Sequence, residues 1–525
     1  MPKSPADILP IHHPRRWLTV IVAAYLIVAI LFALYTPPWQ NPDEPAHYNY
    51  IAHIAEGRGL PVLQMGDYDQ ALRDELTAAK FPPERSIAPL RYENYQPPLY
   101  YVSATPVFWL GRALGSGQPL IWLRLYDVLL GAFSLLLLYG CLRVAFAQTP
   151  SIALAGTAFA ALLPMHVAMN AAVNNDGLAE LLLLAALLTL LRWMTVRLNG
   201  GMGNARQLVL LGALLGLGLL TKIYAYALLP VCLLGVLMTE WRLASGSAFA
   251  KMQAAVQPFV AVLIPAVLLG IPLWLRNALN YGWRDPLGLN WHDKVVVGQV
   301  TTVEWLAQNG WAAYGQRAWD FTFKSFWGVF GWLGLFVDGR IYTTLLLFSA
   351  LLAVGALWVM ARTAWRWGKL SPVRQQVALL FGLMLLAVLA SYALYNLKFV
   401  QHQGRYLFWG LLPVSALMAA GWREITRWRP ALAAVVVVGG LSGWLALNDG
   451  MNKWTLLSGA MLGALLLLQP LLFSAWSSGI FQKNMPVLTK GSLLPLLRAA
   501  AWSAPFLLLF VLNWVCLFLF IVPML

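Results

Sequence analysis

Long apolar runs recur along the whole chain, and they constrain its fold more than any other feature. A run of roughly 20 apolar residues is the length that a helix needs to cross a bilayer. Of the 525 residues, 60% are hydrophobic and only 11% are charged, whereas a soluble domain has about 25% charged residues. Lipid cannot satisfy open backbone polar groups, so such a chain must fold as a helix bundle. We therefore expect an all-α polytopic membrane protein.

The apolar runs predict a bundle of about 13 transmembrane helices. Arg15 and Arg16 precede the first run, which lacks a small-residue cleavage site, and we interpret it as a retained helix and not as a signal peptide. The predicted spans are 17–36, 120–140, 151–172, 177–194, 207–221, 223–238, 254–275, 341–361, 376–396, 405–421, 430–447, 453–475 and 500–522. The three cysteines all lie within apolar runs, and we interpret them as packing residues.

The distribution of Lys and Arg predicts which side of the membrane each loop faces. Cytoplasmic loops are rich in these residues, and the basic runs 362–374 and 423–429 obey the rule only if the apolar stretch 98–114 does not span. We therefore expect 98–114 to be an interfacial helix and the N-terminus to be cytoplasmic, in a protein of the cell (inner) membrane. The net charge of +15 is then explained by basic loops that face anionic membrane lipids, and not by nucleic acid.

Two long segments, 37–119 and 276–340, remain on the extracytoplasmic side. They carry most of the acidic residues and many aromatic residues. We expect residues 1–425, including these two outer segments, to form a catalytic module, and residues 426–525 to add C-terminal transmembrane helices. Any chemistry should then take place at the outer membrane surface.

The first outer segment opens with two adjacent carboxylates, Asp43 and Glu44, between prolines. The pattern predicts a turn into a short amphipathic helix, with Asp43 in a position to cap it. Apolar and aromatic residues then recur at helical spacing until Gly57 and Gly59. A cap and a solvated acid would be the simplest interpretation, but it leaves the cost of a second charge at the bilayer edge unexplained.

Several cations are predicted to lie at the same depth as this acidic pair. Lys222, Arg276 and Arg405 each stand at the outer end of a predicted span, and Asp176 adds another acid there. Each cation alone could be an interface anchor. Three cations at the depth of a pair of acids are more typical of a binding site for an anion than of interface anchors. The planar guanidinium of Arg fits phosphate in particular.

Aromatic residues accompany these charges in both outer segments. Tyr95 and Gln96 precede a rigid Pro-Pro pair, Trp327 belongs to a tryptophan-rich stretch, and Tyr406 follows Arg405. We expect these four residues to contact substrate. An aromatic belt at the membrane interface is the alternative, and the sequence leaves both interpretations open.

This set of residue types suits transfer of a group from a lipid-linked phosphate. The phosphate leaves as an anion, so the reaction needs one base for the attacking hydroxyl and fixed cations for the developing charge. Asp43 would be the base, and Glu44 would position the acceptor or support Asp43. The cations at the outer helix ends would hold the phosphate, in a single displacement with inversion at the anomeric carbon.

The motifs also resemble those of the glycosyltransferase C (GT-C) superfamily, which includes protein O-mannosyltransferases and the aminoarabinose transferase of lipid A. Asn-Pro-Asp-Glu-Pro-Ala-His at 41–47 is similar to the acidic motif of that superfamily, and Gln-Pro-Pro-Leu at 96–99 to the element that follows it. The resemblance implies a polyprenyl-phosphate sugar donor, catalysis on the outer face, a base role for Asp43 and phosphate binding by Lys222. The acceptor could be a protein, a lipid or a glycan.

Some relatives in that superfamily use a divalent metal near the acids. Asp43, Glu44, His47 and Asp176 could supply ligands, but we expect no required metal or cofactor. We expect His47 and Asp176 to contact substrate instead.

Two other functions use the same residues differently. A transporter or flippase of lipid-linked sugars would grip the phosphate without cleaving it, but such proteins are often built from two similar halves. No repeat relates 17–260 to 341–525, and the acids are concentrated in the first outer segment. A structural subunit of an envelope complex would not need Asp43.

Overall fold

The computed structural model describes residues 11, 13–115, 119–448, 451–477 and 493–525. Most of these residues are helical, and the only sheet among them pairs two short antiparallel strands, β1 (Val329–Phe330) and β2 (Leu335–Phe336). Ten helices in the described part are long and apolar enough to cross a membrane, or eleven if one bent pair is counted as a span. The chain is an all-α polytopic membrane protein, as predicted, but the predicted count of 13 spans is not confirmed.

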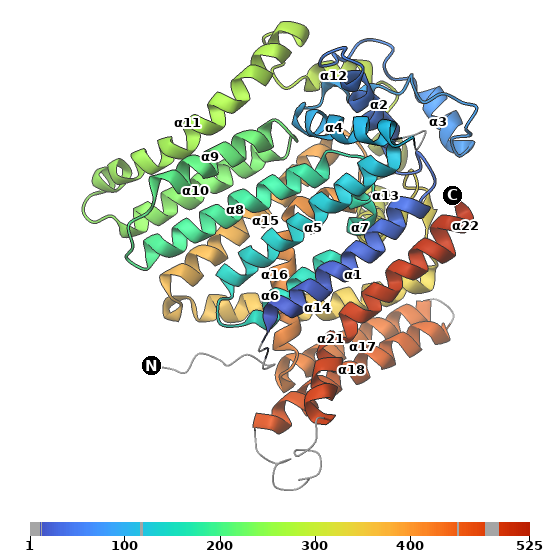
Figure 1. Ribbon diagram of the computed structural model, residues 1–525. Helices are drawn as coiled ribbons and strands as arrows, with labels where there is room; N and C mark the ends of the chain where they lie inside the picture. Colours follow the sequence, from blue (N-terminus) through green and yellow to red (C-terminus); the bar gives the residue numbers. More distant parts are fainter. Residues whose placement is uncertain (1–10, 12, 116–118, 449–450, 478–492) are drawn as a thin grey trace.

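The membrane-length helices coincide with ten of the predicted apolar runs. Nine of them are α1 (Pro14–Tyr35), α5 (Leu120–Ala145), α8 (Asp176–Leu198), α10 (Ala225–Leu243), α11 (Ala248–Tyr281), α14 (Gly339–Trp365), α15 (Pro372–Lys398), α17 (Trp428–Asn448) and α18 (Lys453–Ser477). The tenth is the last span, in which α21 (Leu493–Val515) continues through the π-helical segment η4 (Cys516–Ile521) into α22 (Val522–Met524). Figure 1 shows many of these helices running side by side.

Three predicted spans have a different form. The run 207–221 is a shorter helix, α9 (Ala205–Leu219), and the run 405–421 is a 3-10 turn, η3 (Gly404–Gly410), that leads into α16 (Leu411–Glu424). The run 151–172 is broken into α6 (Pro150–Leu162) and α7 (Pro164–Asn170), which meet at an angle of 65°. The break falls at Leu163, an extended residue before Pro164, because proline lacks an N–H and disfavours a helical residue before it.

The helices of the two predicted outer segments gather at one end of the bundle (Figure 1). We call this end the loop end. Its elements are α2 (Glu44–Ala55), α3 (Gln70–Ala78), η1 (Tyr92–Tyr95), α4 (Leu99–Ala113), α12 (Leu289–Val295) and α13 (Thr302–Trp327). The helix predicted at 98–114 is α4, and α4 is not among the candidate spans. The turn η2 (Trp367–Lys369) joins α14 to α15.

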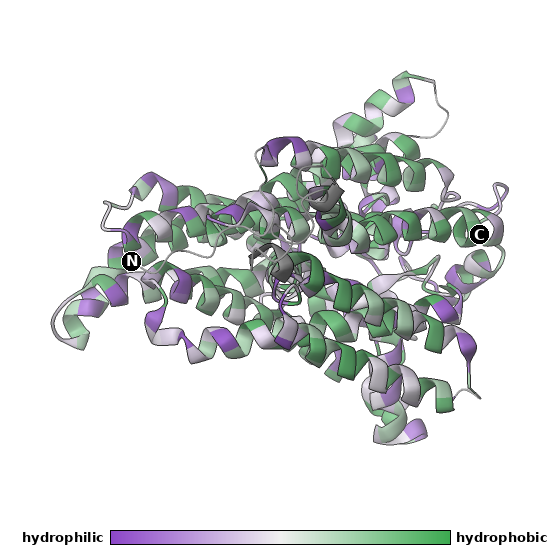
Figure 2. Ribbon diagram, turned by 90° about the horizontal axis from the view of Figure 1, so that it is seen from below, coloured by the Kyte–Doolittle hydropathy of each residue, from purple (hydrophilic) through white to green (hydrophobic). Residues whose placement is uncertain are grey.

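Burial follows this division of the chain. One large apolar core runs through the bundle, and a second, aromatic-rich core lies beneath the loop end around Tyr50, Tyr100 and Tyr101. Apolar residues dominate the bodies of the helices in Figure 2, and hydrophilic residues gather near many helix ends. Where α14 crosses α16, a Cβ atom placed on Gly355 would lie 2.6 Å from the carbonyl oxygen of Gly421. Glycine is therefore required for this close approach.

Candidate active site

A buried ion pair fixes the acidic motif to the bundle. The carboxylate of Glu44 is bonded by Arg124 of α5, with Nη2 at 2.6 Å from Oε2 and Nε at 2.8 Å from Oε1, and both side chains are fully buried. The backbone N–H groups of Trp39 and Val173 donate to the same carboxylate, at 3.1 and 3.2 Å. Glu44 therefore has its hydrogen-bonding capacity taken up within the protein.

The same arginine also holds the end of the first span. Its guanidinium donates to the carbonyl oxygens of Ala33, Thr36 and Pro37, at 3.0, 2.7 and 3.1 Å. These carbonyls belong to the last turn of α1 and the residues after it, where no intrahelical donor is available. Arg124 thus ties α1, α5 and the acidic motif into one rigid unit.

Asp43 has a left-handed backbone, with φ 66° and ψ −5°. Few residues other than glycine adopt this conformation, and Asp is one of those that tolerate it. Asp43 occupies the N-cap position of α2, but its side chain makes no capping hydrogen bond. The predicted cap is therefore wrong. The Asp43 side chain instead accepts hydrogen bonds from Tyr92, at 3.0 Å, and from Arg405, at 3.1 Å.

The ion pair between Asp43 and Arg405 joins residues that are far apart in the sequence. Arg405 belongs to η3, and its Nε donates to Oε1 of Gln403 at 2.6 Å, which orients the guanidinium. Burial raises the pKa of Asp43, but the charge of Arg405 and the hydrogen bonds from Arg405 and Tyr92 hold that pKa below its ordinary value of 3.8. Asp43 is thus ionised and paired at neutral pH.

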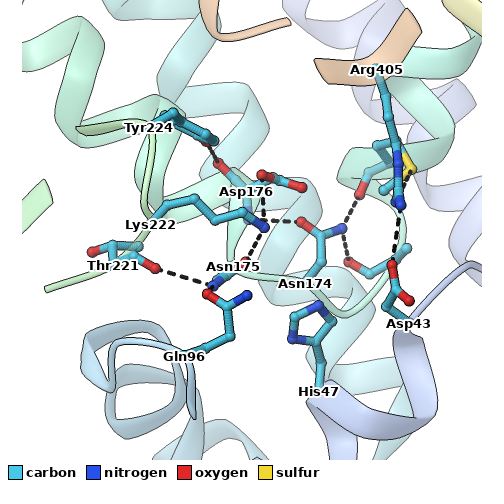
Figure 3. A network of polar contacts seen from close by, with 12 residues as sticks. Asp43, His47, Gln96, Asn174, Asn175, Asp176, Thr221, Lys222, Tyr224 and Arg405 are labelled. Atoms are coloured by element: carbon cyan, nitrogen blue, oxygen red, sulfur yellow. Dashed lines mark hydrogen bonds and ion pairs between the residues drawn. The ribbon is translucent and has the colours of Figure 1, made fainter. Parts of the chain in front are cut away.

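A second ion pair lies beside the first. Lys222, in the short turn between α9 and α10, contacts Oδ1 of Asp176 at 3.1 Å and donates to Oδ1 of Asn175 at 2.5 Å (Figure 3). The side-chain amide of Asn175 in turn donates to Gln96 Oε1, at 3.3 Å, and to the carbonyl of Thr221, at 3.1 Å. This network joins the loop after α7 to the Pro-Pro element and to the Lys222 turn.

His47 lies between the two ion pairs (Figure 3). Its Nδ1 is 2.8 Å from the hydroxyl of Tyr101 in α4. Burial and the charge of Lys222 lower the pKa of His47 from 6.5 to about 3, against the opposing effect of the carboxylates Asp43 and Asp176. His47 is therefore neutral at physiological pH.

Five of the predicted site residues thus form one group at the loop end. We call this group the polar cluster, and its members are Asp43, His47, Asp176, Lys222 and Arg405. It holds two carboxylates, one lysine, one arginine and a neutral imidazole, so its formal charge is balanced without a ligand.

Other predicted site residues lie around the polar cluster or away from it. Tyr95 accepts a hydrogen bond from Gln96 at 3.1 Å, and both residues line a small pocket together with Ile223 and Leu273. The ring of Tyr406 lies 5.5 Å from the guanidinium carbon of Arg405. Substrate contact by these three residues stays a prediction.

Arg276 and Trp327 are not brought into the cluster. Arg276 donates to the carbonyls of Leu60 and Pro61 and so anchors the first outer segment to α11. Trp327, at the end of α13, is buried in the main core, where its ring packs edge-on against Phe159.

The ligand set proposed for a metal is not assembled. Within the described residues, no three His, Cys, Asp or Glu side chains are grouped to hold a metal ion. Asp43 and Asp176 each face a cation, and Glu44 is enclosed by Arg124.

Three residues that organise the site were not among the predicted site residues. They are Arg124, Tyr92 and Asn175. Arg124 offered the clearest signal, because a charged residue inside an apolar span is costly and marks a functional position. The partners of Tyr92 and Asn175 come from distant segments, so local sequence gives no comparable signal.

The fold and the cluster define a class of molecule, a multi-pass membrane protein with a balanced set of partly buried charges at one end of its helix bundle. The family model described as dolichyl-phosphate-mannose-protein mannosyltransferase matches residues 104–269. This match includes Arg124, Asp176 and Lys222 and begins after the Asp43-Glu44 pair. It confirms the resemblance to the protein O-mannosyltransferases that the motifs indicated. None of the curated proteins matches the chain at the sequence level.

Two solved structures are similar to the chain over most of its length. One is the Archaeoglobus fulgidus oligosaccharyltransferase tethered to an acceptor peptide, with 13% sequence identity and a TM-score of 0.46, covering 95% of this chain and 55% of that one. The other is ArnT from Cupriavidus metallidurans bound to undecaprenyl phosphate, with 15% identity and a TM-score of 0.46, covering 94% of this chain and 76% of that one. The chain thus spans about half the length of the archaeal protein.

Proposed function

We propose that the protein is a membrane glycosyltransferase. It would move a sugar from a polyprenyl-phosphate donor to a hydroxyl group of a protein, lipid or glycan acceptor, on the extracytoplasmic face of the inner membrane. The observation that supports this most directly is the polar cluster, in which the carboxylate of Asp43 and the cations Arg405 and Lys222 share one end of the bundle. The family match agrees with a lipid-phosphate donor.

The proposed reaction is a single in-line displacement. The acceptor oxygen attacks the anomeric carbon while the bond from that carbon to the phosphate oxygen breaks, and the electron pair stays on the phosphate. The acceptor proton passes to Asp43, which acts as the general base. Arg405 and Lys222 stabilise the charge that develops on the leaving phosphate.

The ion pairs suggest how the donor prepares the base. A phosphate that binds Arg405 and Lys222 competes with Asp43 and Asp176 for the same cations. Losing the full interaction with Arg405 would raise the pKa of Asp43 from its lowered value, because a nearby opposite charge favours the ionised form of a carboxyl. Asp43 would therefore become a stronger base only when the donor is bound. Without the donor, Asp43 would stay ionised and would not be protonated by solvent.

The other predicted residues take supporting roles in this proposal. Glu44, enclosed by Arg124, supports the placement of Asp43 rather than binding the acceptor. Arg276 holds the first outer segment in place through the carbonyls of Leu60 and Pro61.

The decisive test is Asp43→Asn, because Asn keeps the shape and tolerates the backbone of Asp43 but cannot take up the proton. The proposal predicts that the variant binds undecaprenyl phosphate at least as well as the wild type, since a competing carboxylate charge is gone, while sugar transfer is lost. Asp74→Asn, at an exposed position on the same outer segment, is the matched control. Transfer by Asp43→Asn at the wild-type rate would exclude Asp43 as the base.

Donor binding is tested separately at the two cations. Lys222→Ala and Arg405→Ala should each weaken the binding of undecaprenyl phosphate by roughly ten- to a hundredfold, the effect of losing one hydrogen bond to a charged group. Arg284→Ala, at an exposed position near the start of the second outer segment, should leave it unchanged. A lipid-linked sugar that is bound and moved across the membrane without cleavage, with no effect of Asp43→Asn, would support a flippase instead.

A further inference from the structure

Glu93 is a buried carboxyl beside the polar cluster that the proposed reaction does not use. It belongs to η1, between Tyr92, which donates to Asp43, and Asn94, and only 9% of the residue is exposed. Among the described residues, no hydrogen-bond partner is found for Oε2 of Glu93. A buried carboxylate oxygen with no donor is costly, so this oxygen needs an explanation.

The other buried acids of the first outer segment are satisfied by the protein. Glu44 has Arg124, and Asp67 accepts from the backbone of Gln64 at 2.9 Å and pairs with Arg91. Glu93 has no ion pair of this kind within the described part of the chain. Glu93 therefore differs from Glu44 and Asp67, because its buried Oε2 atom can still accept a hydrogen bond.

The groups that face Glu93 come from several elements. Asp43 precedes α2, Lys222 lies in the turn between α9 and α10, and His292 lies on α12; the charges of all three act on the Glu93 carboxyl. The phenols of Tyr92, Tyr95 and Tyr101 are also close enough to interact with it. The charges of the proposed base and of the proposed phosphate cation therefore both act on Glu93.

Burial, reinforced by the charge of Asp43 and opposed by Lys222 and His292, raises the pKa of Glu93 from 4.5 to about 7. The carboxyl thus changes its charge near neutral pH, and it becomes a stronger hydrogen-bond acceptor as the pH rises.

In the proposed function, the anomeric carbon must lie between the acceptor oxygen at Asp43 and the phosphate at Lys222. The sugar ring must then lie next to these two groups, whose charges both act on the Glu93 carboxyl. We propose that Glu93 is a donor-contacting residue that accepts a hydrogen bond from a hydroxyl group of the transferred sugar. This inference rests on the proposed function, since it assumes a sugar-phosphate donor.

The test compares lipid phosphate with and without a sugar. Wild type and Glu93→Gln are titrated with undecaprenyl phosphate, and with undecaprenyl-phosphate mannose, glucose and aminoarabinose. The wild type should bind at least one sugar-bearing lipid more tightly than the bare lipid. Glu93→Gln should reduce that advantage by about tenfold or more, because the bond to a charged acceptor is lost, while bare-lipid binding stays intact and shows that the variant is folded.

Two further variants make the outcome specific. Glu84→Gln, at an exposed position on the same outer segment, should leave the sugar advantage unchanged. Glu93→Asp keeps the carboxyl group but shortens the side chain. It should bind the bare lipid normally and lose part of the preference for the sugar-bearing lipid. Glu93→Asp serves as the test variant if Glu93→Gln does not fold. In the wild type the advantage should increase from pH 6 to pH 8, and this increase should persist in His292→Gln and disappear in Glu93→Gln.

The failures of the two proposals can be told apart. If the wild type does not bind bare undecaprenyl phosphate, the proposed function fails. If it binds that lipid but shows no advantage for any of the three sugars, or if Glu93→Gln keeps the full advantage, the role of Glu93 is wrong. A Glu93→Gln effect confined to the KM of the acceptor would also overturn it.

Discussion

Arg124→Met should be among the most destabilising single changes in the first outer segment and its surroundings. The substitution keeps an unbranched apolar side chain inside α5 but removes five hydrogen bonds, two to Glu44 and three to carbonyls at the end of α1. The carboxyl group of Glu44, which is fully buried, would then have no arginine beside it.

The size of the effect follows from that burial. Removing one partner of a buried ion pair costs about 3–5 kcal/mol, because the remaining charge is uncompensated. An exposed pair contributes about 0–1 kcal/mol. Arg58, which pairs with Glu56 and has a side chain that is 64% exposed, supplies the matched control on the same outer segment.

The assay is the unfolding free energy in detergent micelles or nanodiscs, measured for both variants with a denaturant and without reference to activity. Arg124→Met should lose several kcal/mol and Arg58→Ala about 1 kcal/mol or less. A double variant, Arg124→Met with Glu44→Gln, should recover part of the loss because it removes the stranded charge. Equal stability of Arg124→Met and Arg58→Ala would refute the view that this pair holds the acidic motif in place.

Three other predictions follow from particular contacts. The pKa of His47 is lowered from 6.5 to about 3. Between these two pH values the unfolded chain binds more protons than the folded chain, so the free energy of unfolding falls as the pH falls. His47→Gln should reduce this pH dependence by up to about 1.4 kcal/mol per pH unit, as measured in melting curves at a series of pH values. Gly355→Ala should cost about 1–3 kcal/mol by forcing α14 from α16, whereas Gly382→Ala, which has open space around it, should be neutral or stabilising in the same unfolding measurement. Cysteine at the exposed position Arg366 should resist an impermeant maleimide added to intact cells, and labelling from outside would reverse the predicted orientation.

Apolar run length was enough to predict the membrane-length helices, because the bilayer sets a minimum length that few other folds require. It was not enough to predict the break between α6 and α7. Pro164 is visible in the sequence, but α11 contains three prolines, Pro258, Pro265 and Pro272, and continues through all of them. A proline alone therefore does not predict a break, and at this one the Nδ1 atom of His166 lies 2.9 Å from the carbonyl oxygen of Ala160 on the other side.

The sequence predicted the depth of the site residues in the membrane but not which of them lie close together. Charge patterns give the depth of a residue in the membrane, and depth selected Lys222, Arg276 and Arg405 together. Depth carries no information about where a residue lies in the plane of the membrane. In that plane the three cations do not share one site, because Arg405 contacts Asp43, whereas Arg276 donates to the carbonyls of Leu60 and Pro61. Burial and an unused hydrogen-bonding atom, which single out Glu93, are properties of packing that a sequence pattern does not contain.

Because Asp43 has a left-handed backbone, most substitutions at this position would change the backbone as well as the functional group. A longer or β-branched replacement would fit that backbone poorly, at a cost of roughly 1–2 kcal/mol, and would shift the start of α2 along with its own functional group. Glutamate, the obvious choice for retaining an acid, therefore changes geometry as well as reach. Only asparagine and glycine would leave the chain path intact, so the inactivity of other variants would say little about proton transfer.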